Sequence, residues 1–135
     1  MTEPSLQKLR AHAEDVIQNS YSPYSKFRVG ALLLSRDGSR IFTGVNVENS
    51  SFGLTVCAER NALFQAIGEG EREFSFLYIL ADGDIPPRPC GACLQVLSEF
   101  CSPDMPVTCE SMSGNREAFR FRDLLPFGFS FPKSE

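Results

Sequence analysis

Long apolar runs, basic runs and histidine are all scarce in this sequence. No apolar stretch approaches the roughly 18 residues of a membrane-spanning helix, and the N-terminal segment has no apolar signal core. The net charge of -4 and the lack of a Lys/Arg run argue against nucleic acid as the main partner. These features predict a cytoplasmic protein that acts on a small neutral molecule, with neither a membrane nor nucleic acid as partner.

Cysteine is present in an odd number, with five in 135 residues. Cys90 and Cys93 have the spacing of metal ligands or of a redox pair rather than that of a secreted disulfide framework. This spacing suits a reducing compartment. Cys101 and Cys109 have no such spacing, and we expect both to be core residues. The only histidine, His12, is far in sequence from these cysteines, so we expect no ligand role for it.

The length fits one domain over residues 1–135, since such a chain can bury about two thirds of its unfolded surface. Apolar residues at helical spacing predict a helix from Leu6 to Ile17, with Thr2 as its cap, and a second helix that starts near Ala58 and is capped by Gly68. A third helix is expected from about Gly91 to Phe100.

Strands are predicted on both sides of the second helix. Asp37-Gly38 is a hairpin signal between strands over 27–34 and 40–47. Further strands are expected over 74–81, near 107–112 and near 118–121. Strands that alternate with helices favour a largely parallel α/β sheet with helices on both faces and ligands beyond the carboxyl ends of the strands. The short turn before the last strand predicts that this strand returns antiparallel.

Two short segments carry the chemistry. Cys57-Ala58-Glu59 is followed 33 residues later by Cys90-Gly91-Ala92-Cys93, with Pro89 just before. Three cysteine ligands leave the fourth position of a tetrahedral zinc ion to water, whereas a structural site usually fills it with another Cys or His. Glu59 then stays free to transfer protons, and the pair of motifs has the general form found in zinc deaminases.

The predicted helices place these cysteines at helix N-termini, where unpaired N–H groups and partial positive charge stabilise thiolates. Three thiolates around a dication leave a local charge of about -1, which weakens the pull of the metal on bound water. Arg60 follows Glu59, and we expect its guanidinium to donate to the ligand sulfurs and offset that charge.

The segment from Ala31 to Leu125 combines these motifs with Gly44-Val45-Asn46-Val47-Glu48-Asn49 and Cys57-Ala58-Glu59-Arg60. In these residues the chain resembles the small zinc-dependent cytidine deaminases of pyrimidine salvage. The resemblance covers nearly the whole chain. It implies a three-layer α/β/α fold with a five-stranded mixed sheet, one Zn²⁺ per subunit, and a homotetramer with sites near subunit interfaces.

The implied reaction is hydrolytic deamination of cytidine and 2'-deoxycytidine to uridine and 2'-deoxyuridine plus ammonia. Zinc activates a water that attacks C4, with Glu59 as proton shuttle. By resemblance, Asn46 and Glu48 hydrogen-bond the ribose hydroxyls, Phe27 packs on the pyrimidine, and the backbone of Ala58 contacts the base.

Two positions depart from the family pattern. Phe52 stands where many relatives have a tyrosine that reaches a neighbouring subunit's site, and it lacks the hydroxyl. Phe127-Gly128-Phe129 replaces a more usual Gly-Ala-Phe, so pocket closure by Phe129 and the effect of Phe127 on substrate range stay open.

Several other interpretations remain. Cys90-x-x-Cys93 alone would fit a thioredoxin-like dithiol or half of a structural zinc site. Glu59 and Arg60 alone would be ordinary first-turn charges, and Asn49 favours a turn. Within the deaminases, the substrate could be another aminopyrimidine nucleoside, including blasticidin-type antibiotics. A nucleic-acid deaminase would need a basic channel, and a non-enzymatic zinc module would need four protein ligands.

Overall fold

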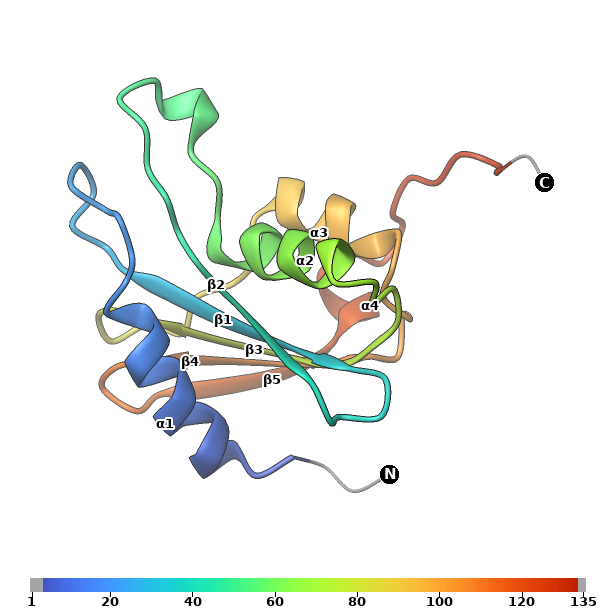
Figure 1. The fold of residues 1–135 in the computed structure, drawn as a ribbon, viewed down its shortest axis with the longest axis horizontal. Coiled ribbons are helices and arrows are strands. Elements are labelled where there is room, and N and C mark those ends of the chain that lie inside the picture. Colours follow the sequence, from blue (N-terminus) through green and yellow to red (C-terminus); the bar gives the residue numbers. More distant parts are fainter. Residues whose placement is uncertain (1–3, 134–135) are drawn as a thin grey trace.

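The computed structural model describes residues 4–133. A single five-stranded sheet lies between helices on both faces, as predicted for a three-layer α/β/α fold (Figure 1). In chain order the elements are α1 (Leu6–Ile17), β1 (Val29–Ser35), β2 (Ile41–Val45), the short 3-10 helix η1 (Phe52–Leu54), α2 (Ala58–Gly68), β3 (Phe74–Ala81), α3 (Gly91–Ser98), β4 (Pro106–Ser111), β5 (Arg116–Arg120) and α4 (Phe121–Leu124).

The sheet has the strand order β2-β1-β3-β4-β5. Only the β3–β4 pair is parallel, while β1–β2, β1–β3 and β4–β5 are antiparallel. The expectation of a largely parallel sheet is therefore wrong, although β5 does return antiparallel as predicted. The physical reason is that β2 and β3 run in the same direction but do not pair with each other, because β1 lies between them.

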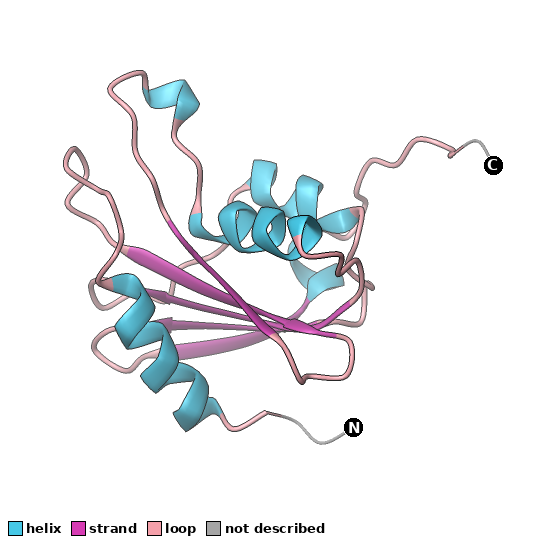
Figure 2. Cartoon of the chain, viewed as in Figure 1, coloured by secondary structure: helices cyan, strands magenta, loops and turns pink. Residues whose placement is uncertain are grey.

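Two crossover connections place their helices on one face of the sheet. α2 joins β2 to β3 across β1, and α3 joins β3 to the adjacent β4, so both helices lie above the sheet in Figure 2. Their buried residues form one core cluster with side chains of that face, including Ala62, Leu97 and Val107. α1 covers the opposite face through Leu9, Ala13 and Ile17.

The predicted helices and strands begin and end within two residues of the expected bounds, but two predicted helix caps differ. α1 begins after Ser5, whose side-chain oxygen accepts from the N–H of Lys8, so Thr2 is not its N-cap and lies outside the described residues. α2 includes Gly68, so Gly68 is not its cap; the C-cap is Glu69, followed by Gly70 in the left-handed conformation with φ 89°. The hairpin turns at Asp37-Gly38 as predicted, with Gly38 at φ 76°.

Large apolar side chains remain exposed on two segments that leave the body of the fold. One is the arm from residue 46 to 57, which carries η1 far from the sheet, and the other is the C-terminal segment after α4 (Figure 1). Phe52, Leu54, Phe127, Phe129 and Phe131 are all at least two thirds exposed. Among the described helices, none has both the length and the apolar character that crossing a membrane requires.

Candidate metal centre and adjoining pocket

Three cysteines meet where two helices begin above the carboxyl ends of β2 and β3. Cys57 is the N-cap residue of α2 and Cys90 is the N-cap residue of α3, each with extended backbone angles. Cys93 lies in the first turn of α3 and is buried. The two sequence segments therefore converge as predicted, while Cys101 and Cys109 are buried in the core. His12 is exposed on α1 and takes no part in this cluster.

The sulfur positions fit a tetrahedral zinc ion. The Sγ atoms of Cys57 and Cys90 are 3.8 Å apart, those of Cys90 and Cys93 are 3.5 Å apart, and all three lie within 4.8 Å of one another. Zinc–sulfur bonds of about 2.3 Å in a tetrahedron separate the sulfurs by about 3.8 Å. Within residues 4–133, no further His, Cys, Asp or Glu joins this cluster, so three protein ligands are available.

The surroundings of the cluster favour deprotonated sulfur. A hydrogen bond from the Cys93 thiol, with a further one from the Arg60 guanidinium, lowers the pKa of Cys57 to about 5 despite partial burial. The same contact with Cys57 raises the pKa of Cys93. Both helix N-termini add partial positive charge near the sulfurs. These surroundings thus favour the thiolate form of Cys57.

Arg60 lies beside the sulfurs as predicted. Its terminal nitrogen Nη2 is 3.6 Å from Sγ of Cys57, and its pKa is raised, chiefly by that contact. The Nε atom of Arg60 is the one buried side-chain nitrogen or oxygen of the described residues that has no hydrogen-bond partner. A buried N–H without an acceptor costs free energy, so the position of Arg60 beside the sulfurs is not explained by its own hydrogen bonding alone.

Glu59 lies next to the cluster but outside it. It occupies the first turn of α2, and only 5% of the residue is exposed. Burial raises the pKa of its carboxyl group to about 7. A first-turn glutamate that merely complements the helix dipole would normally face solvent. The burial of Glu59 therefore argues against the simple helix-charge interpretation.

A pocket of about 260 Å³ opens beside the cysteines and is lined by Glu59, Cys57 and Cys90. This is slightly below the usual size of a small-molecule site. The remaining lining residues come from five short segments: Ser25, Phe27, Val29, Asn46, Glu48, Thr55, Ala58, Ile79, Pro87 and Arg88. Phe27, Asn46, Glu48 and Ala58, which the family resemblance names as substrate contacts, thus lie together at the pocket.

Asn46 is buried and its side chain already binds the backbone. Its Oδ1 accepts from the N–H of Val29 at 2.9 Å and from the Ser20 hydroxyl, and its Nδ2 donates to the carbonyl of Phe27 at 2.8 Å. One N–H of the amide remains for another acceptor. Asn46 therefore holds the strand entry beside Phe27 in addition to facing the pocket.

Glu48 organises the loop before Phe27. Its Oε1 accepts from the N–H groups of Tyr24 and Ser25 at 3.0 and 3.1 Å, and its Oε2 accepts from the Ser25 hydroxyl. These contacts, first that with the Ser25 side chain, lower the pKa of Glu48. The carboxylate keeps free lone pairs toward the pocket.

Asn61 is a site residue that the sequence did not reveal. Its Nδ2 donates to the carbonyl of Val45 at 2.7 Å and contacts that of Val56 at 3.5 Å. These carbonyls directly precede Asn46 and Cys57. One amide thus joins the strand end that carries Asn46 to the helix start that carries Cys57. A single asparagine inside a helical pattern gives no signal for such a contact.

Phe52 and Phe129 do not line this pocket. Phe52 packs edge-on against Tyr24, with ring centroids 5.8 Å apart, and lines a neighbouring hollow that shares Ser25, Glu48 and Thr55 with the pocket. Phe129 is held by its carbonyl, which accepts from Gln95 Nε2 at 2.8 Å, and its ring is exposed. Within one chain neither ring closes the site.

Comparison with known proteins gives consistent matches. Residues 4–109 match the family model described as "Cytidine and deoxycytidylate deaminase zinc-binding region". The chain is 46% identical over 125 residues to a cytidine deaminase of Sporosarcina psychrophila, covering 93% of this chain and 91% of the relative. A cytidine deaminase of Halalkalibacterium halodurans is 44% identical over 124 residues, covering 92% and 93%.

Solved structures agree with these sequence matches. The crystal structure of cytidine deaminase from Burkholderia pseudomallei superposes with a TM-score of 0.87 at 40% identity. The superposition covers 93% of this chain and all of the other. The mixed five-stranded sheet with its helices is thus shared with a solved protein over almost the whole chain.

Proposed function

The chain belongs to the family of zinc-dependent cytidine deaminases and is a hydrolase with one zinc per subunit as its cofactor, and from this premise we propose that it deaminates cytidine and 2'-deoxycytidine. The products are uridine, 2'-deoxyuridine and ammonia, and the role is pyrimidine salvage. Residues 1–135 act as a single catalytic domain. The observation that carries the proposal is the buried Glu59 carboxyl group in the same pocket as the converging cysteines.

Cys57, Cys90 and Cys93 hold the zinc ion through their thiolates. Zinc held by these three thiolates would lower the pKa of a bound water and so make it a nucleophile near neutral pH. Arg60 donates toward the sulfurs and withdraws part of their negative charge, as its 3.6 Å contact with Cys57 supports. The spacing of the sulfurs supports these ligand roles.

Glu59 moves the protons of the reaction. Its carboxylate takes a proton from the attacking water, whose oxygen forms a bond to C4 of the pyrimidine, and delivers this proton to N3. It then takes the proton of the new C4 hydroxyl group and gives it to the 4-amino group, as the C4–N4 bond breaks, the C4=O bond forms and ammonia leaves. A buried carboxyl group that is easily protonated suits both roles, because one residue acts first as base and then as acid.

The other pocket residues orient the nucleoside. The Phe27 ring, which is 40% exposed, packs on the pyrimidine, and the backbone N–H of Ala58 contacts the base at the start of α2, where helical N–H groups have no intrahelical partner. The free N–H of Asn46 and the lone pairs of Glu48 bind the ribose hydroxyls. Both side chains are already fixed by the protein, so they are preorganised for the ligand.

The active form is a homotetramer with sites near its subunit interfaces. The support is the exposure of Phe52 at 74% and Phe129 at 68%, because large apolar side chains gathered on protruding segments are typical of interaction surfaces. Such contacts would close the small open pocket of each chain. Sedimentation velocity tests this part, and an active monomer would contradict it.

The proposed location is the cytoplasm, where a reducing medium keeps metal-binding thiolates available. Nucleic acid is not expected as a partner, since the net charge is -4. Binding to single-stranded oligonucleotides in a gel-shift assay would contradict that expectation.

The test of the activity is the fall in ultraviolet absorbance as purified protein converts cytidine, 2'-deoxycytidine or cytosine. Glu59→Ala serves as the control, and it should keep zinc and fold while turnover falls by about three orders of magnitude or more. Near-normal turnover in this variant would refute the role of Glu59. Zinc-loaded protein that turns over only another aminopyrimidine nucleoside would correct the substrate but keep the reaction class.

A further inference from the structure

Arg28 and Asp82 form a paired contact at the edge of the pocket. The guanidinium of Arg28 donates from Nε to Asp82 Oδ2 and from Nη2 to Asp82 Oδ1, both at 3.0 Å. The backbone N–H of Arg28 also donates to Oδ2 at 2.9 Å, and the N–H of Asp82 donates to the carbonyl of Arg28 at 3.0 Å. A fork-to-fork pair with backbone bonds defines both position and orientation of the two residues.

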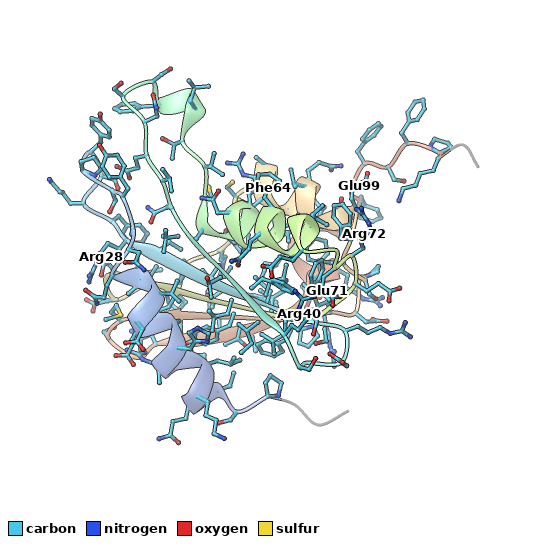
Figure 3. The ribbon with its side chains drawn as sticks, viewed as in Figure 1. Arg28, Arg40, Phe64, Glu71, Arg72 and Glu99 are labelled. Atoms are coloured by element: carbon cyan, nitrogen blue, oxygen red, sulfur yellow. The ribbon has the colours of Figure 1, made fainter. Side chains whose placement is uncertain are left out.

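The pair continues the β1–β3 ladder by one residue pair beyond its end. Val29 of β1 is paired with Ala81 of β3, and the next residues outward are Arg28 and Asp82. At this point the chain before β1 and the chain after β3 both leave the sheet. Figure 3 shows Arg28 at this end of the sheet, close to the end of α1, and Arg40 and Glu71 toward the other end.

Both departing segments contribute residues to the pocket lining. Phe27 lies directly before Arg28, and Pro87 and Arg88 lie in the loop that follows Asp82. This loop has a second hollow of about 420 Å³ on another side, lined by Phe27 and by residues 82–88. Open space on two sides means that packing alone does not fix the loop.

Other tethers of the loop lead away from Phe27. Asn115 Nδ2 donates to the carbonyl of Asp84 at 2.7 Å, and Arg88 pairs with Glu117 at 3.1 Å, so both join the loop to the β4–β5 side. Within residues 4–133, the Arg28–Asp82 contacts are the hydrogen bonds that join the loop to the segment carrying Phe27.

We propose that Arg28 and Asp82 are positioning residues for the nucleoside, because they fix the Phe27 segment relative to the Pro87–Arg88 loop. This inference rests on the proposed deaminase function and extends it to two residues that do not themselves line the pocket. The two side chains remain about a quarter to a third exposed, so the pair contributes little to overall stability. Its effect falls on substrate binding.

The molecule contains a control ion pair next to the same two strands. Arg36 follows β1 and Glu73 precedes β3, and their side chains pair at 3.0 Å at the opposite end of the sheet. The experiment compares Arg28→Ala, Asp82→Ala and the double variant with Arg36→Ala and Glu73→Ala. Asp82→Asn and Arg28→Lys test rescue, because each keeps part of the hydrogen bonding.

We expect each alanine variant of Arg28 or Asp82 to raise KM for cytidine about fivefold, with kcat changed less than about twofold. The double variant should be no worse than the single variants, the conservative variants should be intermediate, and zinc content should stay at wild-type level. Arg36→Ala and Glu73→Ala should keep the wild-type KM. Equal KM values in both sets of variants would overturn the inference.

Hydrogen exchange provides a readout that does not depend on turnover. In Asp82→Ala the amides of residues 24–27 and 83–85 should exchange faster than in Glu73→Ala. Unchanged exchange would overturn the inference, as would faster exchange without a change in KM. Wild-type protein that fails to convert cytidine would instead refute the proposed substrate, and the exchange comparison would still test whether the pair holds the two segments together.

Discussion

A Cβ atom added to Gly44 would lie 2.2 Å from the carbonyl oxygen of Ala58. The same atom would lie 2.4 Å from the backbone nitrogen of Ala62, so β2 and α2 touch through their backbones at this point. Real Cβ contacts are never this short, and the neighbouring atoms are backbone rather than flexible side chain. The close approach presses the first turn of α2, with Cys57 before it, onto the strand that leads to Asn46.

Gly44→Ala is therefore expected to displace α2. Overpacking usually costs 1–3 kcal/mol, and a clash with backbone should cost about 3 kcal/mol or more of unfolding free energy. Zinc retention after dialysis should also fall, because Cys57 moves with the helix. Chemical denaturation and metal analysis check both effects, with Gly68→Ala as control since nothing lies within 4 Å of its added Cβ. Wild-type stability in Gly44→Ala would show that α2 can move without cost.

Arg60→Gln is expected to keep the zinc ion but slow the reaction. The variant removes the positive charge that lies 3.6 Å from the Cys57 sulfur, so the three thiolates keep more of their negative charge. A change in a group that supports metal ligands typically costs about 10–100-fold in activity or affinity. We expect the smaller end of this range for kcat. Arg72→Gln, on an exposed side chain, is the control, and equal rates in both variants would make Arg60 an ordinary helix charge.

Asn46→Ala should lower both stability and substrate binding. The buried Asn46 side chain satisfies the N–H of Val29 and the carbonyl of Phe27, and leaving such groups unpaired costs about 1–3 kcal/mol. Ser20→Ala removes one hydrogen bond to the same Oδ1 and does not touch the pocket lining. Denaturation and KM for cytidine should separate the two roles. A KM that rises equally in both variants would mean that Asn46 acts only through the scaffold.

Tyr78→Phe should affect stability without affecting catalysis. The hydroxyl of Tyr78 donates to Glu110 Oε1 at 2.7 Å, on the face of the sheet that α1 covers. Burial raises the pKa of Tyr78. Glu110 also accepts from Arg10 at 2.7 Å, so it keeps one partner in the variant. We expect a loss of about 1–2 kcal/mol in the free energy of unfolding. Thermal denaturation measures this loss, with Tyr21→Phe as the control. A changed kcat/KM in Tyr78→Phe would contradict the prediction and show coupling across the sheet.

Features that depend on neighbouring residues could be predicted from the sequence. α1 and β3 have the predicted bounds, because each is coded by a periodic run of apolar residues. The cysteines and Glu59 meet because each motif lies at the start of a helix that follows a strand, and both helices lie on the same face of the sheet. Short-range patterns were sufficient for these features.

Features that depend on strand pairing could not be predicted in this way. The run β2, α2, β3 has the same pattern whether β3 pairs with β2 or passes beyond β1, so the sequence did not show that only one strand pair of the sheet is parallel. The Arg28–Asp82 contact requires the register of β1 against β3, which no local signal carries. The contact of Asn61 with Val45 likewise depends on how closely α2 approaches β2.

The hairpin turn at Asp37-Gly38 leaves a part of the molecule open to engineering. β1 runs from Val29, which lines the pocket, to Ser35, so the turn lies about 20 Å along the strand from the catalytic end. A Cβ atom added to Gly38 would meet nothing within 4 Å, and Gly38 belongs to an exposed turn. Exposed turns of this kind accept inserted residues well. This turn could therefore carry a fluorophore, an affinity peptide or a linker for surface immobilisation without a change in the pocket beside the cysteines.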